Sequence, residues 1–431
     1  MENTLINEYD EKPPIYERLL LSLAGLFITI NFIILSILRP QAVLGHILMI
    51  LVWSVCAWVG NYGLNRLLPH RDRLLFPLVI FLSGWGLVMI DRLEPTFADR
   101  QAVWLMLSVL AMLLVAATPK VLMWLKNYRY LWLTFGLTLL ISTILLGSNP
   151  SGLSSAPQLW LGFGDIYFQP SEALKIILVV FLASYLAEQY RTMRAEGLIS
   201  GNRWMALSPR LYGPTLLMWG LSIVILIWQR DLGTAVVFFG VFLVLIYTAS
   251  GYSLVLISGI ALITIAAVAA YYLFDVVQLR VDIWLNPWAD ADGDAYQLVQ
   301  SLQAFAAGGI IGEGIGLGYP NFIPVVHSDF VFAALAEEWG LIGTIVAVCC
   351  LFVLVVRGMI IATYQQGQPF KALMAVGFST LIGVQSLLIM GGVTRLFPLT
   401  GVTLPFMSYG GSSLLMSFIM IGLLLRLSEK T

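Results

Sequence analysis

A single carboxylic acid stands where a long polar loop meets an apolar run. The sequence VVHSDF at 325–330 places Asp329 after His327 and Ser328 and directly before that run. An acid at such a junction can act as a general base toward a hydroxyl group, or it can cap a helix that begins at Phe330. A helix N-terminus favours the anion by about 0.3–1 kcal/mol, whereas burial beside lipid raises the pKa of a carboxyl. The spacing leaves both interpretations open.

Two further acids, Glu337 and Glu338, interrupt the same apolar run. They lie about 12–14 Å beyond the first acid if the segment is helical. Residues 341–356 are nearly long enough to cross a bilayer alone, so 330–339 is expected at the outer boundary, with Gly340 relaxing the joint. We expect the two glutamates to anchor the outer loop through hydrogen bonds, and a direct part in catalysis is the alternative.

An acid and a cation also share one helix face. Glu172 and Lys175 are three residues apart and follow Pro170, which suits a first helical turn. A lysine one turn inside lipid needs a partner or a polar cavity. Either Lys175 pairs with Glu172, or it reaches a cavity that holds an anionic group.

The composition indicates which elements must position these side chains. The chain has 431 residues, of which 59% are apolar and 11% charged, and its mean hydropathy is +0.89. Soluble domains carry about 25% charged residues, so we expect an all-α polytopic membrane protein. The first residues are acidic and polar and lack the basic n-region and cleavage site of a signal peptide. Cys56, Cys349 and Cys350 form no CxxC pair and the histidines are scattered, so neither a disulfide framework nor a zinc site is expected.

Twelve runs are long and apolar enough to be transmembrane helices. They cover approximately 19–38, 43–64, 74–90, 101–117, 130–146, 171–189, 213–228, 233–250, 254–274, 340–356, 372–393 and 411–427. We expect a cytoplasmic tail at 1–18, N-terminal transmembrane helices at 19–128 and a functional core at 129–431. Outer loops are expected at 147–170 and 275–329.

The distribution of charge predicts the orientation. Most of the 23 lysines and arginines fall on one side of the membrane, which places both chain ends in the cytoplasm. The arginines on the outer side are Arg39, Arg92, Arg100, Arg230, Arg280 and Arg395. The first three are expected to be solvated loop charges, and Arg395 has no assigned role. Arg280 and Arg230 are candidates for holding an anionic group, although Arg230 and Asp231 could instead form an interfacial anchor.

The largest outer loop, at 275–329, contains one periodic segment. Leu298, Leu302 and Phe305 recur at helical spacing and predict a short amphipathic helix at 296–306 on the outer surface. We find no strand pattern in the chain.

Two glycine-containing stretches predict backbone that approaches other groups closely. GGIIGEGIGLG at 308–318 lacks the Lys-Ser/Thr of a phosphate-binding loop, so we expect a flexible groove wall and no nucleotide site. TGVTLPFMSYGGSSLL is expected to be a broken re-entrant segment that lines a cavity. Ser412 and Ser413 could cap the helix that follows.

Five stretches occur in one order along the chain. They are FQPSEALK at 168–175, QRDLGTA at 229–235, AYQLVQSLQAFAAGGIIGEGIGLG at 295–318, HSDFVFAALAEEWGLIG at 327–343 and PLTGVTLPFMSYGGSSLL at 398–415. Together they resemble the SEDS family (shape, elongation, division and sporulation), to which RodA and FtsW belong. The resemblance runs from about residue 130 to the C-terminus. The chain departs from the family at Leu159, where arginine is usual, at Ile389, where asparagine is usual after Gln385, and in having twelve predicted spans instead of ten.

The resemblance implies a peptidoglycan glycosyltransferase. Members polymerise lipid II, the undecaprenyl-pyrophosphate disaccharide-pentapeptide, at the outer face of the bacterial plasma membrane during cell elongation or division. It also implies a class B penicillin-binding protein as partner, contact with other membrane proteins of the elongation or division complex, and no nucleic acid. No firm cofactor is implied, although a divalent cation could accompany the pyrophosphate.

The resemblance places the essential acid at Asp329. With the residue types above, it gives as candidate substrate-binding residues Glu172, Lys175, Arg230, Asp231, Arg280, Gln297, His327, Ser328 and Ser412. The expected supporting residues are Glu337, Glu338, Pro405, Gly410 and Gly411. A flippase for the same precursor and a non-enzymatic scaffold are the alternatives. The notable polar residues cluster at outer helix ends and not near the bilayer midplane in matching halves, which disfavours the flippase.

Overall fold

The computed structural model describes residues 15–149, 158–164, 166–195, 231–365 and 367–429, together with scattered residues between 213 and 227. Within these ranges, eleven helices are long and apolar enough to cross a membrane. The all-α polytopic architecture is therefore confirmed. The span predicted at 213–228 lies largely outside the described residues.

The spanning helices follow the predicted runs closely and often extend beyond them. They are α2 (Ile15–Leu38), α3 (Val43–Leu67), α4 (Leu75–Leu93), α5 (Pro95–Ala117), α7 (Arg129–Leu146), α8 (Pro170–Ala195), α10 (Leu232–Ser250), α11 (Ser253–Leu273), α14 (Val331–Tyr364), α15 (Pro369–Val393) and α16 (Gly411–Ser428). Shorter elements are η1 (Pro40–Ala42), α6 (Val121–Asn127), α12 (Asp275–Leu285), η4 (Pro287–Asp290), α13 (Tyr296–Gly308) and η5 (Pro320–Phe322). The amphipathic helix predicted at 296–306 corresponds to α13.

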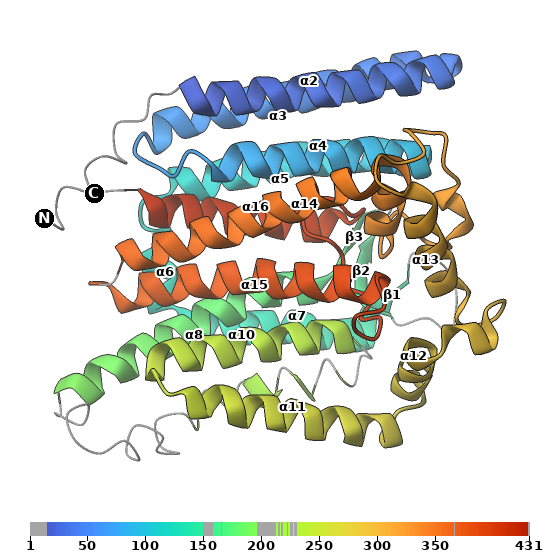
Figure 1. Ribbon diagram of the computed structural model, residues 1–431. Helices are drawn as coiled ribbons and strands as arrows, with labels where there is room; N and C mark the ends of the chain where they lie inside the picture. Colours follow the sequence, from blue (N-terminus) through green and yellow to red (C-terminus); the bar gives the residue numbers. More distant parts are fainter. Residues whose placement is uncertain are drawn as a thin grey trace, which may run out of the picture.

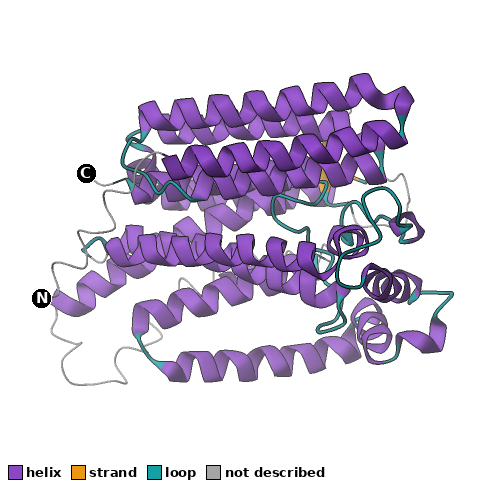
Figure 2. Cartoon of the chain, turned by 45° about the horizontal axis from the view of Figure 1, so that its top comes forward, coloured by secondary structure: helices purple, strands orange, loops and turns teal. Residues whose placement is uncertain are grey.

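The helices form one bundle with an uneven distribution of burial. Figure 1 shows α2 and α3 along one edge, α11 along the opposite edge, and α4, α8, α14, α15 and α16 between them. α4 and α8 are the most buried spans, whereas almost all of α11 is exposed. Figure 2 shows long loops and short helices gathered at one end of the bundle. That end contains α12, α13 and the loop that leads to α14.

Three short strands correct the sequence interpretation, which found no strand pattern. β1 (Gly147–Ser148), β2 (Trp160–Phe163) and β3 (Ile166–Phe168) form an antiparallel sheet in the order β1-β2-β3. Alternation of apolar and polar residues becomes recognisable over about four to eight residues, and these strands have two to four. The sheet lies at the same end of the bundle as α12 and α13 (Figure 1).

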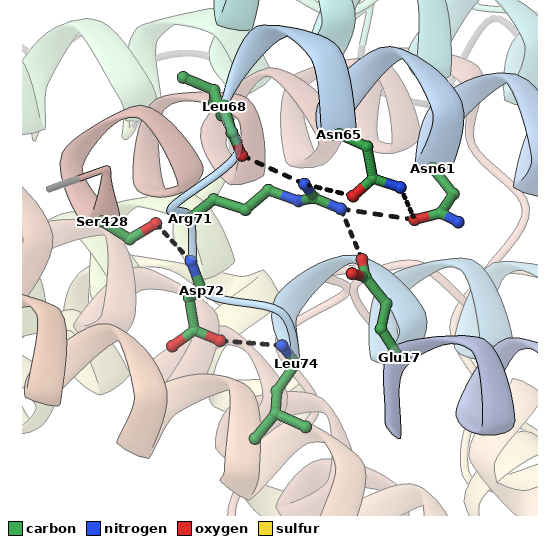
Figure 3. Close-up of polar contacts among 8 residues, drawn as sticks. All are labelled: Glu17, Asn61, Asn65, Leu68, Arg71, Asp72, Leu74 and Ser428. Carbon is green, nitrogen blue, oxygen red and sulfur yellow. Dashed lines mark hydrogen bonds and ion pairs between the residues drawn. The ribbon is translucent and has the colours of Figure 1, made fainter. Parts of the chain in front are cut away.

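A buried arginine, Arg71, joins the first turn of α2 to the last turns of α3 (Figure 3). Arg71 donates to Glu17 Oε1 at 2.6 Å, to Asn61 and Asn65, and to the carbonyl of Leu68. The next backbone N–H, that of Asp72, donates to Ser428 Oγ in the last turn of α16. The first described helix therefore begins where the last one ends, at the end of the bundle away from α12 and α13.

Candidate active site

Asp329 lies at the end of the large loop, two residues before α14. Its Oδ1 accepts a hydrogen bond of 2.7 Å from Ser328 Oγ. α14 has Phe330 at its N-cap position and no side-chain cap, so the structure does not support the capping interpretation. Burial raises the pKa of Asp329, while the Ser328 hydroxyl and the charge of Arg280 act to lower it. A carboxylate in this setting has the environment of a general base.

Arg280 approaches Asp329 from a different element. It lies on α12, and its Nη1 donates to the carbonyl of Thr400 at 3.4 Å. A methyl group built at Gly401 would lie 3.8 Å from both Arg280 Nη2 and Asp329 Oδ2. The cation and the acid therefore both lie close to one point, the place that a side chain at Gly401 would occupy. Burial lowers the pKa of Arg280, and the charges of Asp329 and Asp231 act to raise it.

Lys175 forms the second charged group of the site. It is 4% exposed, and its Nζ lies 2.6 Å from Glu172 Oε2 and 3.0 Å from Gln385 Oε1. The Gln385 amide nitrogen donates to the carbonyl of Thr403 at 2.8 Å. The local Glu172–Lys175 pair thus exists, and it is linked through Gln385 to the segment beside Gly401.

Asp231 interacts electrostatically with both Lys175 and Arg280. It caps α10 by accepting a hydrogen bond of 3.2 Å from Thr234 N. Burial raises its pKa, whereas hydrogen bonds from Thr234 and the charge of Lys175 act in the opposite direction. Gly233, two residues on, packs so closely against the carbonyl of Thr400 that a Cβ there would collide with it. α10 therefore begins at an acid that interacts electrostatically with both cations.

The irregular segment between α15 and α16 joins these parts. Tyr409 N donates to the carbonyl of His327 at 2.9 Å, and Ser408 Oγ donates to the carbonyl of Ser328 at 2.6 Å. Phe406 has a φ of 68°, which a regular helix does not allow. The broken segment expected from the sequence is present, and it bonds to the carbonyls of the two residues that precede the candidate base.

The remaining supporting residues lie around this segment. Pro405 is buried within it, and Gly410 N is 3.5 Å from Gln101 Oε1. Gly411 begins α16 against the ring of Trp104, which leaves no room for a Cβ. These contacts fix where the segment enters α16.

Ser412 does not cap α16, contrary to the sequence interpretation. Gly410 occupies the N-cap position without a side-chain bond. Ser412 Oγ instead accepts from Gln169 N at 3.0 Å and donates to the carbonyl of Tyr167 at 3.4 Å. Ser413 lies 3.0 Å from the Thr403 hydroxyl. The two serines therefore join α16 to the β3–α8 junction and to the broken segment.

Glu337 and Glu338 hold the glycine-rich run against a break in α14. Glu337 Oε1 accepts from Tyr319 N at 2.6 Å, and Glu338 lies 2.9 Å from Arg92 Nε. The predicted break is present at Gly340, where φ is 65°.

Backbone hydrogen bonds add to these side-chain contacts between 309–319 and the region around Gly340, which together we call the clasp. The carbonyls of Glu337 and Glu338 accept from the N–H groups of residues 313 and 314, and the N–H groups of 341 and 342 donate to the carbonyls of 309 and 310. The groups left unpaired by the break in the helix are thus satisfied by the loop. In the structure, the glycine-rich run is thus held against α14 by four backbone hydrogen bonds.

Arg92 and Arg39 are not solvated loop charges, so that prediction is wrong for both. Arg92 is 7% exposed and donates to the carbonyl of Gly318 in addition to its pairing with Glu338. Arg39 donates to the carbonyls of Asp91 and Arg92. Both pair with groups that are distant in the sequence, which charge counting does not reveal. Arg100 is exposed, as expected.

Three other candidates have different outcomes. Arg230 lies outside the described residues. Gln297 lies on α13, and among the described residues no recorded hydrogen bond joins it to the charged groups. His327 packs edge-on against Phe97 and Tyr409, and burial lowers its pKa.

The sequence analysis gave no site role to Gln385 or Thr400. For Gln385 the sequence offered one signal, a polar amide within an apolar span. The structure shows that this side chain is buried. Thr400 acts through its carbonyl, for which no side-chain signal exists. In the described part of the chain, no group of three or more His, Cys, Asp or Glu side chains is placed to hold a metal ion.

Comparisons with known proteins agree on one group of relatives. The family model for FtsW, RodA and SpoVE, described as cell cycle protein, matches residues 71–431. The peptidoglycan glycosyltransferase RodA of Mycobacterium tuberculosis is 36% identical over 386 residues, covering 86% of this chain and 80% of the relative. The probable peptidoglycan glycosyltransferase FtsW of Geobacter metallireducens is 31% identical over 387 residues, covering 86% and 98%.

Two solved structures share the architecture. One is a chain from a peptidoglycan synthase complex described for its coordination of polymerization and crosslinking. It has a TM-score of 0.68 and 26% identity, covering 83% of this chain and 97% of that chain. The other is the rod shape determining protein RodA of Thermus thermophilus, with a TM-score of 0.58 and 23% identity, covering 83% and 96%. The second likeness concerns the fold alone.

Proposed function

Because the chain belongs to the FtsW/RodA/SpoVE family of cell cycle proteins, we infer that it is a peptidoglycan glycosyltransferase that polymerises lipid II into glycan strands. It is a multi-pass membrane protein. The observation that supports the assignment of its chemistry most directly is the pair of opposite charges, Asp329 and Arg280, that both lie beside Gly401.

Asp329 is the proposed general base. The hydroxyl oxygen of the acceptor sugar forms a bond to the anomeric carbon of the donor, and the bond from that carbon to the pyrophosphate breaks. The pyrophosphate leaves with the bonding electrons, and the hydroxyl proton passes to Asp329 Oδ2. The raised pKa of Asp329 makes it a better proton acceptor than an ordinary carboxylate.

Arg280 and Lys175 are the proposed partners of the pyrophosphate. Both cations lie beside the broken segment, Arg280 through Thr400 and Lys175 through Gln385 and Thr403. A fixed cation stabilises the charge that develops on a leaving group without reorganisation. A divalent cation bound to the substrate would act in the same direction, and its presence stays a prediction.

The proposed orientation places this end of the bundle outside the cell. Lipid II then meets the site at the outer leaflet, and α2 begins and α16 ends at the cytoplasmic surface. The proposed partner is a class B penicillin-binding protein that cross-links the strands, within the elongation or division complex. The resemblance to a chain of a peptidoglycan synthase complex supports this partner.

Replacing Asp329 tests the assignment of the base. The purified protein, with its transpeptidase partner, is incubated with labelled lipid II, and glycan polymer is separated on a gel. We expect Asp329→Ala and Asp329→Asn to lower the polymerisation rate by about 100-fold or more, because either change removes the proposed proton acceptor. A folded Asp329→Ala protein that polymerises at the wild-type rate would show that the base lies elsewhere.

A further inference from the structure

Arg395, an outer arginine without a role from the sequence, bonds to the end of α12. Its Nε donates to the carbonyl of Trp284 at 2.8 Å, and its Nη2 donates to the carbonyl of Leu285 at 2.6 Å. In return, Trp284 Nε1 donates to the carbonyl of Arg395 at 3.1 Å. The two segments are therefore joined by three hydrogen bonds in both directions.

Two of these bonds supply donors to carbonyl groups at the C-terminus of α12. Trp284 and Leu285 are the last two residues of α12, and the last carbonyls of a helix have no partner within it. A cation there also complements the negative end of the helix dipole. α12 has no basic residue of its own in the last turn. Arg395, from the loop after α15, supplies that cation.

α12 has little else to hold it in place. None of its residues is buried, and it follows α11, whose buried residue is Gly259. Tyr271 of α11 donates to Asp282 at 3.1 Å, but that bond joins α12 to the edge of the bundle and not to the site. Among the described residues, the recorded hydrogen bonds from α12 to the site side run through Arg280, Trp284 and Leu285.

Arg280 and Trp284 are four residues apart, so they lie on one face of α12. One side-chain bond from that face reaches the carbonyl of Thr400, and one reaches the carbonyl of Arg395, five residues earlier in the same loop. The loop thus sets both the position of α12 and the position of Gly401. We propose that Arg395 is a positioning residue that docks α12 and thereby holds Arg280 opposite Asp329; this inference rests on the proposed function.

A double-mutant cycle measures this dependence. Polymerisation of labelled lipid II is compared for wild type, Arg280→Ala, Arg395→Ala and the double variant, each with the transpeptidase partner. We expect a loss of about 100-fold for Arg280→Ala and of roughly 10- to 100-fold for Arg395→Ala. The double variant should be no slower than Arg280→Ala, since Arg395 acts through Arg280. Losses that multiply would overturn the proposal.

Two further variants separate positioning from general damage to the fold. Arg395→Lys can still donate to helix carbonyls, so we expect it to recover part of the rate that Arg395→Ala loses. Tyr271→Phe removes the bond from α12 to α11 and should leave the rate within about twofold of wild type, as expected for an exposed hydrogen bond. If Arg395→Lys were as slow as Arg395→Ala while Tyr271→Phe were equally impaired, a specific docking role would be excluded.

Hydrogen exchange gives a readout that does not depend on activity. Backbone N–H groups at 275–290 should exchange faster in Arg395→Ala, while those of α15 remain protected. Unchanged exchange would contradict docking by Arg395. Faster exchange at full activity would show that docking does not serve the chemistry. A wild-type protein without polymerase activity would refute the proposed function, and the exchange data would then decide the docking claim alone.

Discussion

At the scale of single residues, the environment of Asp329 adjusts its strength as a base in two directions. Burial raises the pKa of the carboxyl, and the Ser328 hydroxyl and the charge of Arg280 lower it. A base must be ionised to accept a proton, yet a higher pKa makes it a stronger acceptor. The neighbours therefore act against part of the effect of burial on this carboxyl.

Removing the Ser328 hydroxyl is expected to shift the pH dependence of the reaction. In Ser328→Ala the group that lowers the pKa of Asp329 is lost, so the pKa rises further. The rate falls when the base becomes protonated, so the acidic limb of the profile of kcat/KM against pH should move to higher pH. Ser250→Ala, a serine at the other end of the bundle, should leave that limb in place. A shift of the limb to lower pH in Ser328→Ala would contradict the role of Asp329 as base.

At the scale of elements, the broken helix α14 is supported by a loop and not by a neighbouring helix. Residues 308–314 supply both donors and acceptors to the unpaired groups around Gly340. The close approach requires glycine on both sides, since a Cβ at Gly312 would meet the carbonyl of Glu338 and a Cβ at Gly340 would meet Gly312 N. The glutamates that precede the break thus lie where α14 changes direction.

Gly340→Ala should destabilise the protein. The residue has a φ of 65°, and an added Cβ would collide with the backbone of 310–312. We expect a loss of at least about 2 kcal/mol, seen as a lower thermal midpoint in detergent. Gly45→Ala is the matched control, because nothing lies within 4 Å of its added Cβ. Equal midpoints for the two variants would mean that the clasp does not contribute to stability.

The long elements were predictable from sequence, and the contacts between them were not. Apolar length alone identifies a span such as α15, and Gly340 was recognisable as a joint because residues 341–356 are nearly long enough to cross a bilayer alone. The pairing of Glu338 with Arg92 and the bonds of Arg395 join residues distant in sequence. A carbonyl such as that of Thr400 has the same chemistry in every residue, so its role depends on the fold alone.

At the scale of the whole molecule, the two ends of the bundle contain different charged clusters. One end contains Asp329, Arg280 and Lys175, while the other contains the buried pair of Arg71 and Glu17. At that second end, α2, α3, α4 and α16 meet through a few side chains (Figure 3). This cluster therefore fixes the N-terminal helices to the last span.

Arg71→Ala is expected to weaken the attachment of α2. Glu17 is 3% exposed and would lose its charged partner in a buried position. Removing one member of a buried ion pair costs about 3–5 kcal/mol, so the thermal midpoint should fall markedly. Arg66→Ala removes an exposed cation over the ring of Tyr62 and should have a small effect. Similar midpoints for the two variants would contradict a structural role for the cluster.

The exposed position of α11 has a consequence for how the enzyme depends on its surroundings. α11 leads directly into α12, the helix that contains Arg280, and it is exposed along nearly its whole length. A span in that position adjusts its tilt to the thickness of the hydrocarbon layer. The hydrophobic thickness of the bilayer is thus expected to influence where α12 holds Arg280, which would make the membrane part of the support of the proposed active site.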